Sequence, residues 1–474
     1  MESVQSDEDT IWNNKIVKTG RRLANIEVYQ PPWDGSLFAP NDSEYKPEIV
    51  TLNLSDISLL DRYLAEIGNP VECKTNLTVR EAVAQNKSVK QNLFMERPSW
   101  DRFYWQMGTC DLYREGSPIV DELLHDLETM EIKSVVMHTG GTQIKLLITF
   151  INNRKALFKP NKYGINYESN PNHFYFTDFE RATAEIAAFH LDRLLGYRRA
   201  APTVGRQLDL REIKEKADKA LARTFFVSPA NNLCFVGKCD YYCETGFATC
   251  GNPDTITGSV QAFLPSRDVV NREEYKSFYR GTYSKKDQIP EWRKNKNFCQ
   301  ENLLIRADYA KNYRRLLDVI DMHIFDFLMG NLDRHHYQVI EIPGRDDVKA
   351  YPVHLDNGRG FGRPREDDDY LLEPLDQCCV IRPSTVRTLL HYYKGNPKTL
   401  SQAMKQSLAS DPLAPVLPEK HMPAIDRRLA KVLQHVVGCL RKVEDFRTVI
   451  RTEYDNPSWV SDPPEDPDSD EKLF

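Results

Sequence analysis

The sequence predicts an α+β fold in two lobes, a small one built around a sheet and a larger one that is mainly helical. At 474 residues the chain exceeds the length at which one hydrophobic core usually stops growing, so more than one lobe is expected. Short apolar runs separated by turn residues cluster between residues 134 and 159, a pattern typical of antiparallel strands. After residue 315, apolar residues recur mostly at helical spacing.

The chain divides into four predicted segments. Residues 1–95 are polar and weakly periodic, and we interpret them as an N-terminal extension that lies over a core. Residues 96–265 are predicted to form the sheet lobe with a cysteine-rich insertion, and residues 266–450 the helical lobe. Residues 451–474 are acidic and rich in proline, a composition that favours disorder.

The sheet lobe begins with three predicted strands joined by tight turns. In order, the strands cover residues 134–139, 142–151 and 155–159. Gly140-Gly141 and Asn152-Asn153-Arg154 are the turns between them. The third strand ends at Lys159, which places an ammonium group at the end of the hairpin. Further extended segments are expected at residues 224–227 and 260–264.

The helices follow from apolar spacing and capping residues. A helix is predicted over residues 178–195, where Thr177 and Glu180 have the spacing of a capping box. Helical spacing is strongest from Arg315 to Gly330, and Gly330 stands where a C-terminal cap belongs. The remaining predictions are a hairpin with strands at 337–342 and 349–355, and helices at 385–393, 400–408 and 425–443.

The composition is that of a folded protein without a strong charge bias. The chain is 41% apolar and 28% charged, and its 63 basic and 69 acidic residues leave a net charge of −6. This charge is too small to indicate nucleic-acid binding through a general positive field. No apolar run of about twenty residues occurs, so no membrane span is expected. Residues 280–296 form the most basic local stretch, where an acidic partner would bind.

The ten cysteines indicate an oxidising compartment. Cys234, Cys239, Cys243 and Cys250 lie close together, but their spacing differs from the paired short spacings of zinc motifs. We therefore favour disulfides, with a zinc site as the alternative. Weaker support comes from four glycosylation sequons, at Asn41, Asn53, Asn76 and Asn86. The first residues contain no signal-peptide run, and we interpret this as removal of a targeting segment.

Two aspartates lie where phosphotransferases hold their carboxylates. Asp333 follows the predicted helix that ends at Gly330, and Asp356 ends an apolar strand. One carboxylate of such a pair serves the acceptor hydroxyl and the other a metal ion. Lys159 precedes both and ends a strand, from which an ammonium group can reach nucleotide phosphates. The three residues therefore occur in the order expected of a kinase.

Lys159 would need a carboxylate partner from a helix, and Glu180 and Glu185 are the candidates. Glu180 has an alternative role as a capping residue, and Glu185 as a solvated helix residue. His335-His336 could suggest a metal site, but no third ligand is evident, so a structural role is favoured. Neither a Walker loop nor a G-x-G-x-x-G motif is present in the sequence.

Several longer motifs occur in a fixed order over about residues 100 to 450. They are Gly140-Gly141-Thr142-Gln143, Ala156-Leu157-Phe158-Lys159-Pro160, residues 184–193, Ser228-Pro229-Ala230-Asn231-Asn232, residues 325–331, Asp333-Arg334-His335-His336-Tyr337 and residues 354–362. Together they resemble the secretory-pathway kinase family that contains the Golgi casein kinase and the proteoglycan xylosylkinase. Residues 228–232 and 356–362 are closer to the casein kinase branch.

The resemblance implies an atypical two-lobed, protein-kinase-like fold whose helical lobe is stapled by disulfides. It makes Asp333 the catalytic aspartate, and Glu180 and Asp356 the metal ligands. The positions that it assigns to the nucleotide site are Gln143, Lys145, Lys159, the backbone of Gln261, Ala262, Phe263 and Leu264 beside adenine, and Gln338. The family commonly has glutamate where this chain has Gln338, so a charged contact is replaced by a neutral amide.

The resemblance also implies how the cysteines pair. The implied disulfides are Cys234 with Cys250, Cys239 with Cys243, Cys299 with Cys378, and Cys379 with Cys439. Cys73 and Cys110 are then left as a candidate fifth pair.

The activity implied by the resemblance is ATP-dependent phosphorylation of serine in Ser-x-Glu motifs, in the Golgi lumen and in secreted form. Mn²⁺ is the expected metal, with Mg²⁺ as the alternative. Expected partners are secretory proteins with acidic sites, and a second copy of the chain in a homodimer. A glycan xylosylkinase and a pseudokinase that activates a partner kinase are the alternative functions; Glu180, Asp333 and Asp356 argue against the pseudokinase.

Overall fold

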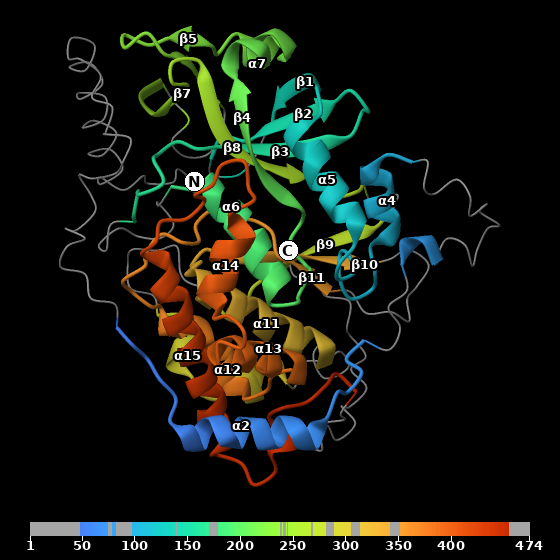
Figure 1. Cartoon of the computed structure of the whole chain (residues 1–474), viewed down its shortest axis with the longest axis vertical. Helices are drawn as coiled ribbons and strands as arrows, with labels where there is room; N and C mark the ends of the chain where they lie inside the picture. The colour runs from blue at the N-terminus through green and yellow to red at the C-terminus, as the bar shows by residue number, and fades with distance from the viewer. Residues whose placement is uncertain are drawn as a thin grey trace, which may run out of the picture.

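The protein has two lobes with separate hydrophobic cores, a sheet lobe above a helical lobe in Figure 1. The computed structural model describes residues 48–73, 78–81, 97–138, 141, 143–169, 179–237, 239, 243, 245–266, 269–280, 289–304, 313–341 and 351–454. Residues 455–474 of the predicted tail and most of the N-terminal extension therefore lie outside the described residues, whereas Arg451 and Thr452, at the predicted start of the tail, are buried.

The sheet lobe is built on a five-stranded antiparallel sheet in the order β1-β2-β3-β8-β4. Its strands are β1 (Ile132–Met137), β2 (Leu146–Phe150), β3 (Lys155–Pro160), β8 (Thr255–Ala262) and β4 (Thr203–Asp209). The three predicted strands are present with shifted bounds: β1 begins and ends two residues earlier than predicted, and β2 begins at Leu146 and not at residue 142. Gly140 and Thr142 lie outside the described residues.

Helices and a small cysteine-rich sheet complete this lobe. They are α4 (Ser99–Gln106), α5 (Pro118–Thr129), α7 (Leu210–Lys216), α8 (Lys219–Ala222), β5 (Phe226–Val227), β6 (Leu233–Phe235), a 3₁₀ turn (Thr245–Phe247) and β7 (Thr249–Cys250). The strand expected at 260–264 overlaps the end of β8, which starts earlier, at Thr255, and ends earlier, at Ala262.

Helix α6 (Ala182–Leu194) lies between the lobes, and Figure 1 shows it directly beneath the sheet. Its small residues, such as Ala184 and Ala187, join the helical-lobe core, while Phe189 joins the sheet-lobe core. The predicted start at residue 178 is wrong, since Arg181 is the N-cap of α6, and Thr177 of the predicted capping box lies outside the described residues. The Arg181 backbone N–H donates to the Gly358 carbonyl at 2.6 Å, so this residue stays extended and the helix begins after it.

A second sheet, in the order β11-β10-β9, forms one wall of the space between the lobes. Its strands are β9 (Asn271–Lys276), β10 (His336–Glu341) and β11 (Tyr351–Val353), all antiparallel. The predicted hairpin is present: β10 lies one residue earlier than predicted, β11 is shorter than the predicted 349–355, and residues 342–350 lie outside the described residues.

The helical lobe packs around α11 (Tyr313–Met329), in which every residue is buried. Gly330 ends this helix with φ +69°, the left-handed conformation that glycine adopts without strain. The other elements are α9 (Glu291–Lys294), a π-helical turn (Cys299–Leu303), a 3₁₀ turn (Asp369–Leu372), α12 (Glu373–Cys378), α13 (Pro383–Tyr393), α14 (Leu400–Leu408), α15 (His421–Leu440) and a 3₁₀ turn (Phe446–Thr448).

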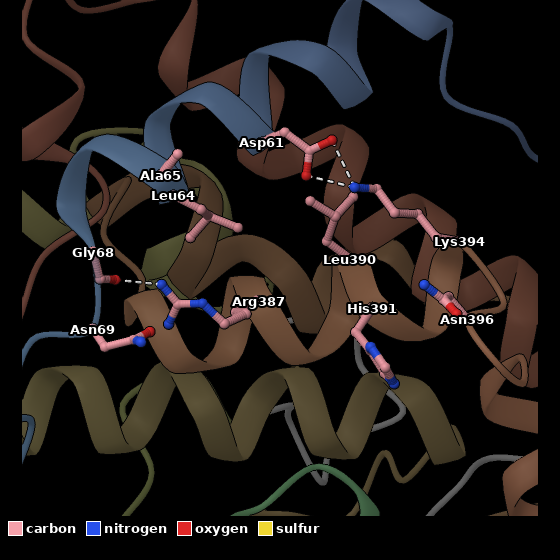
Figure 2. A pocket seen from close by; sticks show the side chains of 10 residues that line it. All are labelled: Asp61, Leu64, Ala65, Gly68, Asn69, Arg387, Leu390, His391, Lys394 and Asn396. Carbon is pink, nitrogen blue, oxygen red and sulfur yellow. Dashed lines mark hydrogen bonds and ion pairs between the residues drawn. The ribbon is translucent and has the colours of Figure 1, made fainter.

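The N-terminal extension contains a helix that the sequence reading missed, α2 (Leu54–Ile67). Asn53 caps it, and Leu60 and Leu64 enter the core of the helical lobe. Figure 2 shows how α2 is held on α13: Lys394 pairs with Asp61, and Arg387 donates to the Gly68 carbonyl. These residues line a surface cavity of about 440 Å³ at the end of the lobe far from the sheet.

Five disulfides cross-link the described chain, and four of them are the pairs that the resemblance implies. The pairs are Cys73–Cys110, Cys234–Cys250, Cys239–Cys243, Cys299–Cys378 and Cys379–Cys439. The clustered cysteines are thus all bonded to one another, which leaves none of them as a zinc ligand.

Three buried histidines predict that acid destabilises the fold. Burial lowers the pKa of His190 and of His323 to about 4, and that of His421 well below its usual range. The unfolded chain binds protons near pH 6.5 while the folded chain does not, so stability is full above pH 6.5 and falls as pH drops towards 4. Each of the first two sites should remove about 1.4 kcal/mol per pH unit over that window.

Urea unfolding at intact disulfides checks this expectation, with the midpoint followed from pH 7.5 to 5. The matched variant His323→Phe removes one of the titrating groups, so its midpoint should fall less steeply with acid than that of the wild type. A midpoint that is the same at pH 7.5 and pH 5 contradicts the assignment of these histidines as buried and neutral.

Candidate active site

Lys159 is the centre of a cluster of carboxylates between the lobes. It is the second-last residue of β3, and its Nζ contacts Glu185 Oε1, Asp356 Oδ1 at 2.8 Å and Glu180 Oε2 at 3.3 Å. The lysine side chain is only 8% exposed. Burial by itself would lower its pKa, but Asp356, Glu185 and Glu180 outweigh burial and raise the pKa well above its usual value. Lys159 is therefore held as a cation.

Glu185 is the helix partner of this lysine. It lies in the first turn of α6 with its side chain 1% exposed, and its Oε1 also accepts a hydrogen bond from the Asn357 backbone N–H at 3.0 Å. Sequence reasoning named it as a suspect but assigned a role only to Glu180. The signal that could have identified Glu185 is that it is a charged residue inside a helix that packs against both cores.

Glu180 and Asp356 face each other across Lys159. Glu180 lies in the loop before α6, and the loop after Asp356 packs against it through Gly358. A Cβ on Gly358 would lie 2.9 Å from the Glu180 Cβ, so only glycine allows this close approach. The Asp356 side chain is 66% exposed towards the cleft, and its backbone has φ +56°, a strained conformation that often marks functional residues.

The charges around these two carboxylates keep both of them ionised. Lys159, then Lys145 at 3.4 Å, lowers the pKa of Asp356 well below its usual range. Burial would raise the pKa of Glu180, but the same two lysines outweigh it and the pKa falls. Ionised oxygens are the ligands that Mn²⁺ and Mg²⁺ prefer.

A metal bound by Glu180 and Asp356 would need further oxygens from a nucleotide. No group of three or more histidine, cysteine, aspartate or glutamate side chains is arranged around a common point within the described residues. One or two carboxylates that share the metal with phosphate oxygens are typical of nucleotide-dependent sites. The pair of Glu180 and Asp356, held together by the Gly358 contact, fits such a metal.

Asp333 lies in the loop that follows α11, outside the lysine cluster. Its backbone N–H donates to Asn331 Oδ1 at 3.1 Å, and its Oδ2 accepts from Arg359 Nη1 at 2.6 Å. His335 Nδ1 lies 3.4 Å from Asp333 Oδ1; burial opposes its protonation, but this aspartate raises the histidine pKa. Arg359 stands three residues after Asp356, so the loop that contains Asp356 also holds the carboxylate of Asp333.

Arg334 ties the two aspartate loops together. It makes two hydrogen bonds to Asp326 of α11, at 2.8 and 2.9 Å, and a third to Asn357 Oδ1 at 2.6 Å. It also donates to the Leu355 carbonyl. The sequence alone did not single out Arg334, Asp326 or Arg359. Nothing in the neighbouring sequence shows which oppositely charged side chain each of them would contact.

A cavity of about 320 Å³ opens beside this cluster. The predicted residues that line it are Lys145, Lys159, Gln261, Ala262, Phe263, Leu264, Gln338 and Asp356. The structure thus brings the proposed adenine segment and the proposed phosphate side into one space. Gln143, Glu180 and Asp333 do not line it; Gln143 Nε2 is buried without a hydrogen-bond partner among the described residues.

The basic stretch at 280–296 lies only partly within the described residues, since 281–288 are outside them. Of the remainder, Lys296 pairs with Glu373 at 2.8 Å, and the Arg293 guanidinium lies over the Tyr370 ring. These contacts tie two of its cations to the helical lobe. In the described part of the chain, no helix has both the length and the apolar character to cross a bilayer.

Comparison with known proteins relates this chain to one family of secretory kinases and kinase-like proteins. The family described as Golgi casein kinase, C-terminal, Fam20 matches residues 98–447. The extracellular serine/threonine protein kinase CeFam20 of Caenorhabditis elegans is 49% identical over 392 residues, 82% of this chain and 75% of that protein. The human extracellular serine/threonine protein kinase FAM20C is 46% identical over 73% of this chain and 58% of its own length. A human pseudokinase, FAM20A, matches at 40%, and a human glycosaminoglycan xylosylkinase at 36%.

The fold is shared with a solved structure of a Golgi casein kinase. The crystal structure of the Golgi casein kinase with Mn and ADP bound superposes with a TM-score of 0.78 at 44% identity, covering 90% of this chain and 99% of the other. This likeness confirms the predicted two-lobed, kinase-like α+β fold. With three quarters of the chain matched by the family and its motifs arranged around Lys159, the chain belongs to the Fam20 family of Golgi casein kinases.

Proposed function

We propose that this protein is a secretory-pathway protein kinase that transfers the γ-phosphate of ATP to serine in Ser-x-Glu motifs. The observation that carries the proposal is the convergence of Glu180, Glu185 and Asp356 on Lys159 at one end of a nucleotide-sized cavity. Phosphoryl transfer needs such a site, because catalysis rests on positioning and charge stabilisation and not on covalent chemistry.

Each residue has a role in this reaction. Lys159, held by Glu185, would contact the nucleotide phosphates, with Lys145 beside it. Glu180 and Asp356 would hold the Mn²⁺ of the nucleotide, which neutralises charge on the transferred group. Asp333, held by Arg359 outside the nucleotide cavity, would accept the proton of the serine hydroxyl. Manganese is favoured over magnesium because a family structure was solved with Mn and ADP.

The acceptor and the compartment are proposed on narrower grounds. Residues 228–232 and 356–362 resemble the casein kinase branch, and identity to the human extracellular kinase exceeds that to the xylosylkinase. Five disulfides favour an oxidising compartment, which the Golgi lumen and the extracellular space both supply. An acidic acceptor would suit the basic stretch at 280–296. A homodimer is the assembly that we propose.

The two alternatives make different demands on the site. A pseudokinase needs no complete set of transfer residues, whereas Glu180, Asp333 and Asp356 are all present here. A xylosylkinase would use the same three carboxylates with a different acceptor, so only the acceptor distinguishes it from a protein kinase.

The test is a transfer assay with both acceptors present. The wild-type protein is incubated with Mn²⁺, labelled ATP, a peptide with one Ser-x-Glu site and a glycan that ends in xylose. Label on the peptide, and none with a Ser-x-Ala control peptide, is the expected result. Label on the glycan alone would make the protein a xylosylkinase, and label on neither acceptor would contradict a kinase function.

A further inference from the structure

Glu274 and Gln338 stand opposite each other on the sheet that lines the nucleotide cavity. The register of β9 against β10 pairs Gln338 with Glu274, and β11 places Val353 on the other side of Gln338. Paired residues in antiparallel strands point to the same face, and all three residues line the cavity. The neighbouring Glu273 points to the opposite face, where its carboxylate accepts from the Tyr275 hydroxyl at 2.7 Å.

Both side chains present an oxygen that has no donor. Gln338 Oε1 is buried and accepts no hydrogen bond from the described residues. The Glu274 carboxylate is exposed and forms no hydrogen bond or ion pair with any residue that the structure describes. A buried acceptor without a donor costs free energy, so this pair is suited to a ligand that brings hydroxyl or amino groups.

The other residues that line this cavity indicate which ligand group the pair meets. Residues 261–264 line the adenine side, and Lys159 with Asp356 lines the phosphate side of the same space. The ribose of a nucleotide joins adenine to the phosphates, and its 2′ and 3′ hydroxyls are hydrogen-bond donors. A metal ion fits less well, because one carboxylate and one neutral amide supply few of the oxygens that such an ion takes.

We propose that Glu274, together with Gln338, binds the ribose hydroxyls and makes this kinase selective for ribonucleotides over deoxyribonucleotides. The proposal rests on the proposed function, since it assumes that the cavity holds ATP. It also assigns a role to the amide at position 338: Gln338 Oε1 supplies a neutral acceptor and Glu274 the negative one. A charged acceptor strengthens a hydroxyl hydrogen bond, so Glu274 should contribute the larger share.

Calorimetric titration with Mn²⁺ present tests the proposal through binding alone. The wild-type protein is titrated with ADP and with 2′,3′-dideoxy-ADP, and ADP should bind at least about tenfold more tightly. Glu274→Ala should weaken ADP binding about tenfold and leave dideoxy-ADP binding unchanged. Glu273→Ala, one residue away on the other face of the sheet, is the matched control and should bind both nucleotides as the wild type does.

The remaining outcomes of the titration contradict either the ribose assignment or the proposed function. Equal affinity of the wild type for ADP and dideoxy-ADP, or an equal loss for both in Glu274→Ala, overturns the ribose assignment. A shift in the Mn²⁺ concentration that supports ADP binding in this variant would make Glu274 a metal ligand instead, which also overturns it. Absence of ADP binding by the wild type contradicts the proposed function itself, and thereby separates the two failures.

Discussion

Replacing Asp333 with alanine is expected to reduce phosphate transfer about a thousandfold while ADP binding stays close to that of the wild type. The size of this reduction follows from the roughly 10²–10⁴-fold by which a positioned general base typically accelerates a reaction. Binding should survive because Asp333 does not line the nucleotide cavity and contacts Arg359 and His335 instead of the lysine cluster. The effect should therefore fall on kcat and not on the affinity for nucleotide.

Transfer to the Ser-x-Glu peptide and calorimetric binding of Mn²⁺ with ADP are measured on the same preparation. Asp369→Ala is the matched control, because Asp369 is an exposed aspartate of the same lobe, paired with Lys431 at 3.2 Å. It should keep full activity. Transfer by Asp333→Ala above a tenth of the wild-type rate would remove Asp333 from the role of base.

Replacing Asp356 with alanine is expected to abolish both transfer and Mn²⁺-dependent nucleotide binding. Asp356 Oδ1 contacts Lys159 and Lys145, and the carboxylate faces the cleft, so its loss would remove the proposed metal ligand and one ion-pair partner from each lysine. Folding should be little affected, because the side chain is 66% exposed and Lys159 keeps Glu185 and Glu180 as partners.

The measurement is ADP affinity as a function of Mn²⁺ concentration, with thermal unfolding as a check on the fold. The wild type should bind ADP more tightly as Mn²⁺ is added, and Asp356→Ala should show no such dependence. Asp356→Asn keeps the size of the side chain without its charge and should lose most of the Mn²⁺ effect. If Asp356→Ala binds ADP with the wild-type Mn²⁺ dependence, this aspartate is not a metal ligand.

Local interactions explain which elements could be predicted from the sequence. The helix at 400–408 was predicted with its observed bounds, and it carries its own capping box between Thr399 and Gln402. The end of α11 at Gly330 was likewise set by a glycine that adopts a left-handed backbone. Helix α2 was missed even though Asn53 caps it and Ile57, Leu60, Leu64 and Ile67 recur at helical spacing, because the segment was grouped with the polar residues on either side of it.

Contacts between residues far apart in the chain explain why the predicted start of α6 was wrong. The start of α6 was placed too early, because Thr177 and Glu180 have the spacing of a capping box. The hydrogen bond from Arg181 to the Gly358 carbonyl, between residues far apart in the chain, decides that start instead. The same contact sets Glu180 beside Asp356 and outside the helix, which is what makes it a candidate metal ligand.

By itself the sequence determined the kinase-like order of Lys159, Asp333 and Asp356 and the family, and it predicted which residues carry charge for phosphoryl transfer. Only the tertiary structure decided which carboxylate serves which cation. Glu185 pairs with Lys159 because α6 is buried between two cores, and Arg359 holds Asp333 because Arg334 joins the two loops. Ion pairing depends on distances of a few ångströms, and those distances are set by packing between segments that are remote in sequence.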